Sequence, residues 1–252
     1  MAGHSHWAGI KHKKALIDNK RGKIWSKISK ALIVAAKLGG GDPDNNPRLR
    51  QAISDAKSAR MPKDTITRAI KKGTGELEGE NFEEFLYEGY GPEGVAVMCE
   101  IMTDNRNRTA PEVRKIFEVA GGKLGVTGCV SYLFERKGLF LFDTDSVEEE
   151  QLLEVIMEAG GEDVKESGKN YEVTCDPEIY ADLAQAFEEA KIEPVSKQVT
   201  MIPSSTIDLE AASAKKVFKL MERLDDHDDV QSVSANWNVS AEVMEQIAQE
   251  VS

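Results

Sequence analysis

Lysines recur along the segment from residue 20 to residue 38 at a spacing that suits phosphate binding. At 100° per residue, one side of a helix here would carry the cations Lys20, Lys23, Lys27, Lys30 and Lys37. The other side would carry the apolar residues Ile24, Ile28, Leu32 and Ala35. Such a helix buries one face and charges the other. Few carboxylates lie nearby in the sequence, so a polyanion is the natural partner of the charged face.

Further cations extend this pattern on both sides of the segment. The additional candidate phosphate-binding residues are Lys11, Lys13, Lys14, Arg21, Arg48, Arg50, Lys63, Arg68, Lys71 and Lys72. If six to ten cations met phosphates, affinity would fall on the order of 10³- to 10⁵-fold between 50 and 200 mM salt. The alternative interpretation is a merely solvated surface, because exposure is the ordinary state of lysine.

Trp7 stands among glycines, histidines and lysines, where an indole has no evident core to join. Aromatic residues interleaved with cations are typical of proteins that bind single-stranded or looped RNA, at ~1 to 3 kcal/mol per stacked base. Trp7 is therefore a candidate for base stacking. The alternative is that its ring packs back onto the helices.

No metal ion or cofactor is expected from the sequence. His4, His6 and His12 have no cysteine or carboxylate at ligand spacing beside them. The acidic run 225–229 lacks the glycine and the terminal glutamate of a calcium loop, so we interpret it as a solvated acidic turn. The glycines at 39–41 are not followed by Gly-Lys-Ser/Thr, so they predict a helix stop and no nucleotide site.

Catalysis is a weaker hypothesis for this chain than nucleic-acid binding. No serine lies in a nucleophile elbow and no cysteine has a recognisable histidine partner. The best remaining catalytic candidate is the polar stretch from Asp104 to Arg108, at a predicted strand-to-helix junction. The competing interpretation, which we favour, is a helix entrance capped by Asn107 or Thr109.

The composition divides the chain into two electrostatically opposite parts. The 252 residues are 40% hydrophobic, which is enough for two or three domains with buried cores. Residues 1–75 hold 17 Lys and Arg against 5 Asp and Glu, a charge of +12, whereas the remainder carries −24. A basic module joined to an acidic one is typical of polyanion-binding proteins, although a chance fluctuation gives the same average. The glycine-rich stretch 72–79 between them predicts a linker.

The location expected from the sequence is the cytoplasm. The longest apolar stretch, 31–36, is far short of the roughly 20 residues of a membrane-spanning helix, and the amino terminus is polar. Three widely spaced cysteines argue against a disulfide framework and fit a reducing compartment.

Periodicity predicts an α+β protein of several domains. Helices are expected over 20–38, from Pro47 toward residue 59, and over 62–73, which together form a three-helix bundle after a basic arm. Strands are then expected over 85–90, 95–102, 131–134, 139–142, 170–175, 195–201 and 230–237, with a turn at 135–138. Further helices are expected after residue 107 and over 147–159, 177–190 and 209–224.

These elements suggest two units of the β-α-β-β-α-β kind, the ferredoxin-like arrangement. Residues 76–134 supply too few elements for one unit, so the last helix and strand are expected to return and complete it. The predicted domains are therefore 1–75, 76–134 together with 207–240, and an inserted domain 135–206.

Several long motifs together resemble the YebC/PmpR family over nearly the whole chain. They are MAGHSHW at the start, IKHKK at 10–14, KRGK at 20–23, LGGGDPDNNPRLR at 38–50, YEGYGP at 87–92 and TDNRNRT at 103–109. The resemblance implies a helical bundle and two α+β domains, the last inserted in the middle one. His6 stands where relatives often carry lysine.

The resemblance also implies a role in gene expression. Bacterial members are described as probable transcriptional regulators that bind promoter DNA, and mitochondrial members as translational activators. We therefore expect a non-enzymatic, DNA-binding transcriptional regulator, with RNA binding at the ribosome to assist translation as the alternative. The acidic α+β domains are expected to repel the nucleic acid and to engage a protein partner. A pure protein-interaction scaffold is a further alternative.

Overall fold

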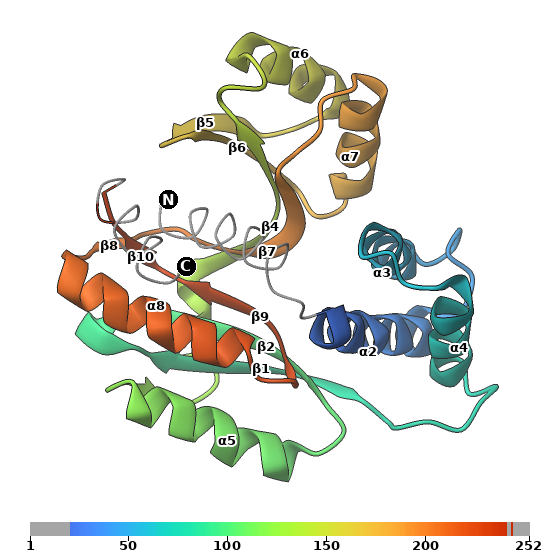
Figure 1. Ribbon diagram of the computed structural model, residues 1–252, viewed down its shortest axis with the longest axis horizontal. Coiled ribbons are helices and arrows are strands. Elements are labelled where there is room, and N and C mark those ends of the chain that lie inside the picture. The colour runs from blue at the N-terminus through green and yellow to red at the C-terminus, as the bar shows by residue number, and fades with distance from the viewer. Residues whose placement is uncertain (1–20, 241–242, 244–252) are drawn as a thin grey trace.

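The structure is a computed structural model and describes residues 21–240 and residue 243. Figure 1 shows the first described helices of the chain grouped at one end of the molecule, beside sheets that carry helices of their own. The helical group precedes the sheets in the sequence. A mixed helix-and-sheet architecture with an amino-terminal helical bundle is thus confirmed.

The bundle consists of α2 (Arg21–Gly39), α3 (Pro47–Ser58) and α4 (Lys63–Gly73). Asn46 caps α3, because its side-chain oxygen accepts a hydrogen bond of 3.0 Å from the Leu49 amide. Apolar side chains from all three helices, with Leu32 and Leu49 fully buried, form a separate core. Gly73 lets α4 approach α2 closely, since a Cβ there would lie 2.4 Å from the Ile33 carbonyl oxygen.

The first sheet has the strand order β3-β1-β2-β9. Its strands are β1 (Glu83–Tyr90), β2 (Ala96–Thr103), β3 (Lys123–Leu124) and β9 (Val230–Ala235). The helices α5 (Arg106–Val119) and α8 (Ala211–Asp225) pack on one face, over a core that includes Phe117, Phe218 and Trp237. Two short parallel strands, β8 (Ile207–Asp208) and β10 (Trp237–Asn238), pair separately.

The second sheet has the order β5-β6-β4-β7 and is antiparallel throughout. Its strands are β4 (Phe134–Asp143), β5 (Asp163–Ser167), β6 (Asn170–Cys175) and β7 (Ser196–Pro203). The helices α6 (Glu149–Ala159) and α7 (Tyr180–Glu189) cover one face, where Phe140, Phe142 and Phe187 pack together.

The chain leaves the first sheet, builds the second and then returns. β9 pairs with β2, so the first sheet is completed only after all strands of the second have been made. The two sheets meet where Ala96 and Met98 of β2 contact Val130 and Phe134. The inserted arrangement is therefore confirmed, while the exact boundaries at residues 75, 134 and 206 stay predictions.

The expected turn at 135–138 was wrong, because β4 runs unbroken through it. Gly138 lies within this strand, and the side chains packed around it leave no room for a larger residue. A Cβ there would lie 2.5 Å from the Cys175 sulfur and 2.7 Å from the ring of Tyr180. Residues 131–133, expected as a strand, form a short 3₁₀ helix instead.

A buried carboxylate fixes the connection that leads into β4. Glu88 of β1 accepts hydrogen bonds from the backbone amides of Gly128, Val130 and Ser131, at 2.7, 2.8 and 2.8 Å. Burial alone would raise the pKa of Glu88, but these three donors outweigh it and hold that pKa below its usual range. One side chain thus replaces the sheet hydrogen bonds that this loop lacks.

Candidate nucleic-acid interface

The lysine row of α2 lies against the acidic loop between α8 and β9. Lys23 Nζ donates to the Asp226 carbonyl oxygen at 3.0 Å, and Lys27 Nζ contacts the Asp225 carboxylate at 3.1 Å. Lys30 Nζ lies 2.6 Å from Asp229 Oδ1 and 2.9 Å from the Asp228 carbonyl oxygen. The spacing that aligns the lysines on one helix face therefore also lets them contact one loop together.

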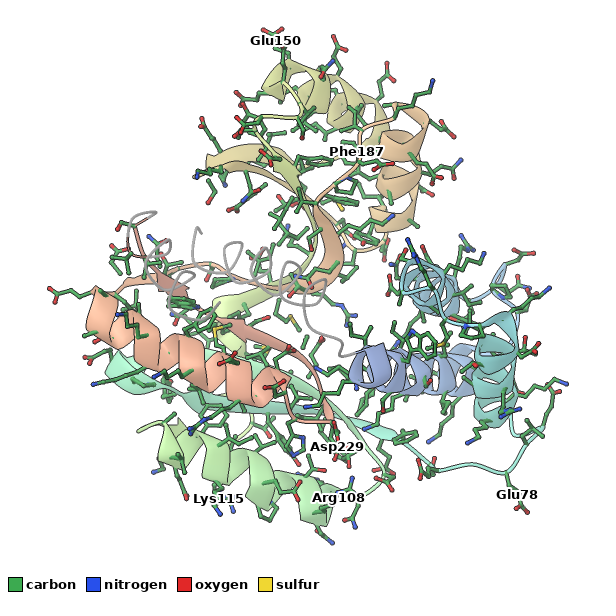
Figure 2. The ribbon with its side chains drawn as sticks, viewed as in Figure 1. Glu78, Arg108, Lys115, Glu150, Phe187 and Asp229 are labelled. Carbon is green, nitrogen blue, oxygen red and sulfur yellow. The ribbon has the colours of Figure 1, made fainter. Side chains whose placement is uncertain are left out.

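Asp229 is the buried centre of this contact, and Figure 2 shows it between the two sheet-packed helices and α2. Its Oδ2 lies 2.7 Å from the Thr109 hydroxyl, 2.9 Å from an Arg108 nitrogen and 3.2 Å from the Thr103 hydroxyl. Burial alone would raise the pKa of Asp229, but the hydrogen bonds from Lys30, Arg108 and Thr109 outweigh it and lower the pKa strongly.

The acidic turn at 225–229 is therefore only partly solvated, contrary to expectation. The Asp229 side chain is 5% exposed and that of Lys30 is 11% exposed, whereas Lys23 remains 46% exposed. The contact partner of the lysines was missed because it lies about two hundred residues away in sequence. The sequence did contain one signal of this contact, because the lysine row of α2 and the aspartate run at 225–229 carry opposite charges.

The TDNRNRT stretch serves this same contact. Asn105 caps α5, accepting a hydrogen bond of 3.1 Å from the Arg108 amide, so the helix begins earlier than the expected caps Asn107 and Thr109 imply. Arg108 also pairs with Asp104 at 3.0 Å. The polar groups of this junction are used in capping and in holding Asp229, which supports the helix-entrance interpretation over the catalytic one.

The two arginines near α3 contact neighbouring parts of the chain. Arg48 makes a two-point ion pair with Glu84 of β1, and one of its hydrogen bonds measures 2.9 Å. Arg50 donates to the carbonyl oxygens of Pro43 and Asp44, at 3.1 and 3.0 Å. Both side chains are exposed, so each guanidinium keeps donors that face water.

α4 presents several exposed cations of the bundle. Ile66 and Ala69 face the core, while the candidates Lys63, Arg68, Lys71 and Lys72 are all exposed. Lys71 lies 3.9 Å from Glu76. Within the part of the chain that the structure describes, Lys63, Arg68 and Lys72 form no ion pair. This helix therefore carries four exposed cations, three of them outside any ion pair in the described residues, together with one exposed carboxylate, Asp64.

The remaining candidates lie before α2 or at its first residue. Trp7, Lys11, Lys13, Lys14 and Lys20 lie outside the described residues, and Arg21 is described only as the first residue of α2. Their roles stay predictions.

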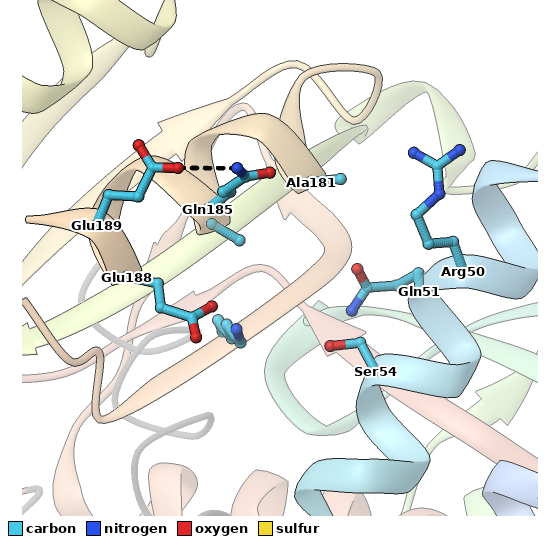
Figure 3. Close-up of a pocket in the computed structure, with 9 residues that line it drawn as sticks. Arg50, Gln51, Ser54, Ala181, Gln185, Glu188 and Glu189 are labelled. Carbon is cyan, nitrogen blue, oxygen red and sulfur yellow. Dashed lines mark hydrogen bonds between the residues drawn. The ribbon is translucent and has the colours of Figure 1, made fainter. Parts of the chain in front are cut away.

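A polar cleft of about 520 Å³ lies between the bundle and the second sheet's helices (Figure 3). Arg50, Gln51 and Ser54 of α3 line one side. The other side is lined by residues of α7 and β7, namely Ala181, Ala184, Gln185, Glu188, Glu189 and Lys197. Two carboxylates match the two cations, so this cleft does not favour a polyanion.

No cluster of three potential metal-ligating side chains occurs within residues 21–240. In the same part of the chain, no helix is both long and apolar enough to cross a membrane.

Comparison with known proteins shows similarity over the full length. A family model described as the TACO1/YebC protein N-terminal domain matches residues 5–76, and one for the TACO1/YebC second and third domain matches residues 82–237. A protein of Rhodopirellula baltica is 58% identical over 244 residues, covering 96% of this chain and 98% of that protein. One of Geobacter sulfurreducens is 51% identical over 247 residues, covering 98% and 100%. Both are named probable transcriptional regulatory proteins.

The fold has also been observed experimentally in a relative. A crystal structure of a conserved hypothetical protein from Aquifex aeolicus is 50% identical, with a TM-score of 0.83. The match covers 93% of this chain and 97% of that one, so the bundle and both sheets are shared.

Proposed function

Because the chain belongs to the TACO1/YebC family, in which relatives are named transcriptional regulatory proteins, we propose that it regulates transcription by binding the phosphate backbone of DNA. The helical domain supplies the binding cations. Most of the acidic remainder of the chain keeps its distance from the DNA and is available to protein.

The observation that carries the proposal is the group of exposed cations on α4, of which Lys63, Arg68 and Lys72 form no ion pair within the described residues. Arg68 projects from the side of α4 opposite the buried Ile66 and Ala69, with the exposed Asp64 beside it, while Lys63 and Lys72 extend from the two flanks of the helix. Exposed cations without local partners attract a polyanion and gain from counterion release when they meet its phosphates. Such contacts orient a protein on a duplex without reading its sequence, so the proposal names no target sequence.

The lysines of α2 differ from one another in exposure. Lys23 is half exposed and can join the positive surface, whereas Lys30 is buried against Asp229. The prediction that Lys27 and Lys30 also contact nucleic acid stays open, since in this structure they contact the 225–229 loop. The proposal therefore depends chiefly on the cations of α4.

The acidic part of the chain supports a separate role in protein binding. On α6, Met157 is 82% exposed and Leu153 is 39% exposed, one helical turn apart. Exposed carboxylates surround them at Glu149, Glu150, Glu154 and Glu158. An apolar pair inside an acidic rim fits a basic protein surface and disfavours DNA.

The proposed function is binding without catalysis. The polar residues from Asp104 to Arg108, which were the best catalytic candidates, are used to begin α5 and to hold Asp229. Gene regulation of this kind requires affinity and positioning only.

The test measures binding of the full chain to a fluorescent DNA duplex of about three helical turns, by anisotropy from 50 to 200 mM salt. One variant combines Lys63→Gln, Arg68→Gln and Lys72→Gln. A matched control combines Arg114→Gln, Lys115→Gln and Lys165→Gln, which removes the same charge from exposed sites on the sheet domains. A ribosomal RNA fragment is measured in parallel.

For three lost phosphate contacts, the slope of log affinity against log salt should become shallower by up to about 2.7 in the α4 variant. The control variant should keep the wild-type slope. Absence of duplex binding at 50 mM salt, or equal effects of the two variants, would contradict the proposal. Tighter binding to the RNA than to the duplex would favour the ribosome-associated alternative.

A further inference from the structure

We infer that α8 carries a second phosphate-binding row, formed by Lys216, Lys219 and Arg223, which contacts the backbone of the same DNA. This inference depends on the proposed function and extends it to a part of the chain whose average charge is strongly negative.

The row follows from the way α8 packs. The residues of α8 that face the sheet are Ala214, Val217, Phe218, Leu220, Met221 and Leu224. At 100° per residue, Lys216, Lys219 and Arg223 fall within an arc of about 60° on the side away from the sheet. All three side chains are exposed. They are therefore held in line by the burial of the opposite face.

The spacing of the row suits a phosphodiester strand. Intervals of three and four residues correspond to about 4.5 and 6 Å along the helix axis. Long lysine and arginine side chains adjust their charged ends by several ångströms, and an arginine can hold one phosphate through two hydrogen bonds. Three consecutive phosphates can thus be met from one helix face.

The charges of the row are not neutralised within the described residues. None of Lys216, Lys219 and Arg223 forms an ion pair there. The only other residue of α8 on the same arc is Ala212, while Glu222 lies on its flank and is half buried. After residue 75 the chain has 39 acidic and 15 basic residues, so three aligned cations without an intervening carboxylate are unusual. This alignment favours a polyanion as the partner of this helix face.

The row leads toward the bundle. The loop that follows α8 receives α2, with Lys23 donating to Asp226 at 3.0 Å and Lys27 to the Asp225 carbonyl oxygen at 2.7 Å. Figure 1 shows this end of α8 beside the beginning of α2. The two aspartates at the junction are thus opposed by lysines. A strand bound along α8 would continue past the half-exposed Lys23 onto the helical domain.

The test uses the same duplex and salt series with a variant that combines Lys216→Gln, Lys219→Gln and Arg223→Gln. Glutamine keeps helix propensity, and all three sites are exposed, so the fold should persist. Coincident far-ultraviolet spectra and unfolding midpoints check this point. The Arg114→Gln, Lys115→Gln, Lys165→Gln protein again serves as the control for lost charge.

We expect the salt slope of the α8 variant to become shallower by up to about 2.7 relative to wild type, while the control keeps its slope. The single variant Lys219→Gln should account for about 0.9 of that change. A wild-type slope in the α8 variant, together with a reduced slope in the α4 variant, would overturn this inference and leave the proposed function intact. Absence of any duplex binding by the wild-type protein would overturn both.

Discussion

Lys30 and Asp229 form a 2.6 Å ion pair inside the protein, although 199 residues separate them in the sequence. The first belongs to the helical bundle and the second to the loop that precedes the last strand of the first sheet. Two threonine hydroxyls and Arg108 complete the contacts of the carboxylate. The orientation of the basic bundle is thereby tied to the acidic part of the chain.

Replacing Asp229 with asparagine should destabilise the protein by about 3 to 5 kcal/mol, because it leaves the Lys30 ammonium buried without its counterion. The free energy of unfolding in urea measures the effect. Asp228→Asn is the matched control, since the Asp228 side chain is exposed and should change stability by no more than about 0.5 kcal/mol. Equal losses in the two variants would show that the buried pair does not stabilise the docking.

Acid should weaken the same contact. The pKa of Asp229 lies below its ordinary value of 3.8, so the unfolded chain takes up the proton at higher pH than the folded protein does. The stabilisation is complete above that ordinary value and is lost progressively as pH falls below it. Unfolding free energies measured from neutral pH to pH 3 should therefore converge for wild type and Asp229→Asn. A constant difference over this range would contradict the assigned pKa direction.

Glu88→Gln should loosen the loop before β4. A glutamine amide accepts hydrogen bonds at one oxygen only, and its NH₂ group faces backbone donors, so at least one buried amide loses its partner at a cost of about 1 to 3 kcal/mol. Hydrogen exchange at Gly128, Val130 and Ser131 should accelerate. Glu84→Gln removes an exposed ion pair with Arg48 and should leave those amides protected. Unchanged exchange in Glu88→Gln would refute the role given to this carboxylate.

Gly138→Ala should destabilise the second sheet by about 1 to 3 kcal/mol, because the added methyl group meets Cys175 and Tyr180. Gly22→Ala is the contrasting variant. Among the described residues, nothing lies within 4 Å of a Cβ at residue 22, which is in α2, so alanine should stabilise by about 0.5 to 1 kcal/mol there. Thermal unfolding midpoints report both changes, and a neutral Gly138→Ala would show that β4 can shift to make room.

Local sequence patterns predicted most of the helices and the longer strands. The lysine and isoleucine periodicity gave α2 to within one residue at each end, and Asn46 with Pro47 gave the start of α3. These signals are local, since capping and amphipathic burial act within one or two helical turns. Gly138 was misread because a glycine required by packing across a sheet resembles a glycine required by a turn.

The candidate site was less predictable. Opposite charge in the two parts of the chain was evident from composition, but Lys30 could not be matched with Asp229 without the fold. The row on α8 was hidden by the negative average around Lys216 and Lys219, since averaging over a domain erases a single helix face. The exposed cations of α4 were predicted directly, because their exposure follows from the apolar periodicity of a single helix.

The long separation between α2 and the 225–229 loop has a consequence for synthesis of the chain. Translation proceeds from the amino terminus, so α2 leaves the ribosome well before the aspartates that receive its lysines. During that interval the contacts that Lys23, Lys27 and Lys30 make with the 225–229 loop cannot form. The bundle acquires its final orientation only when the last strand has been made.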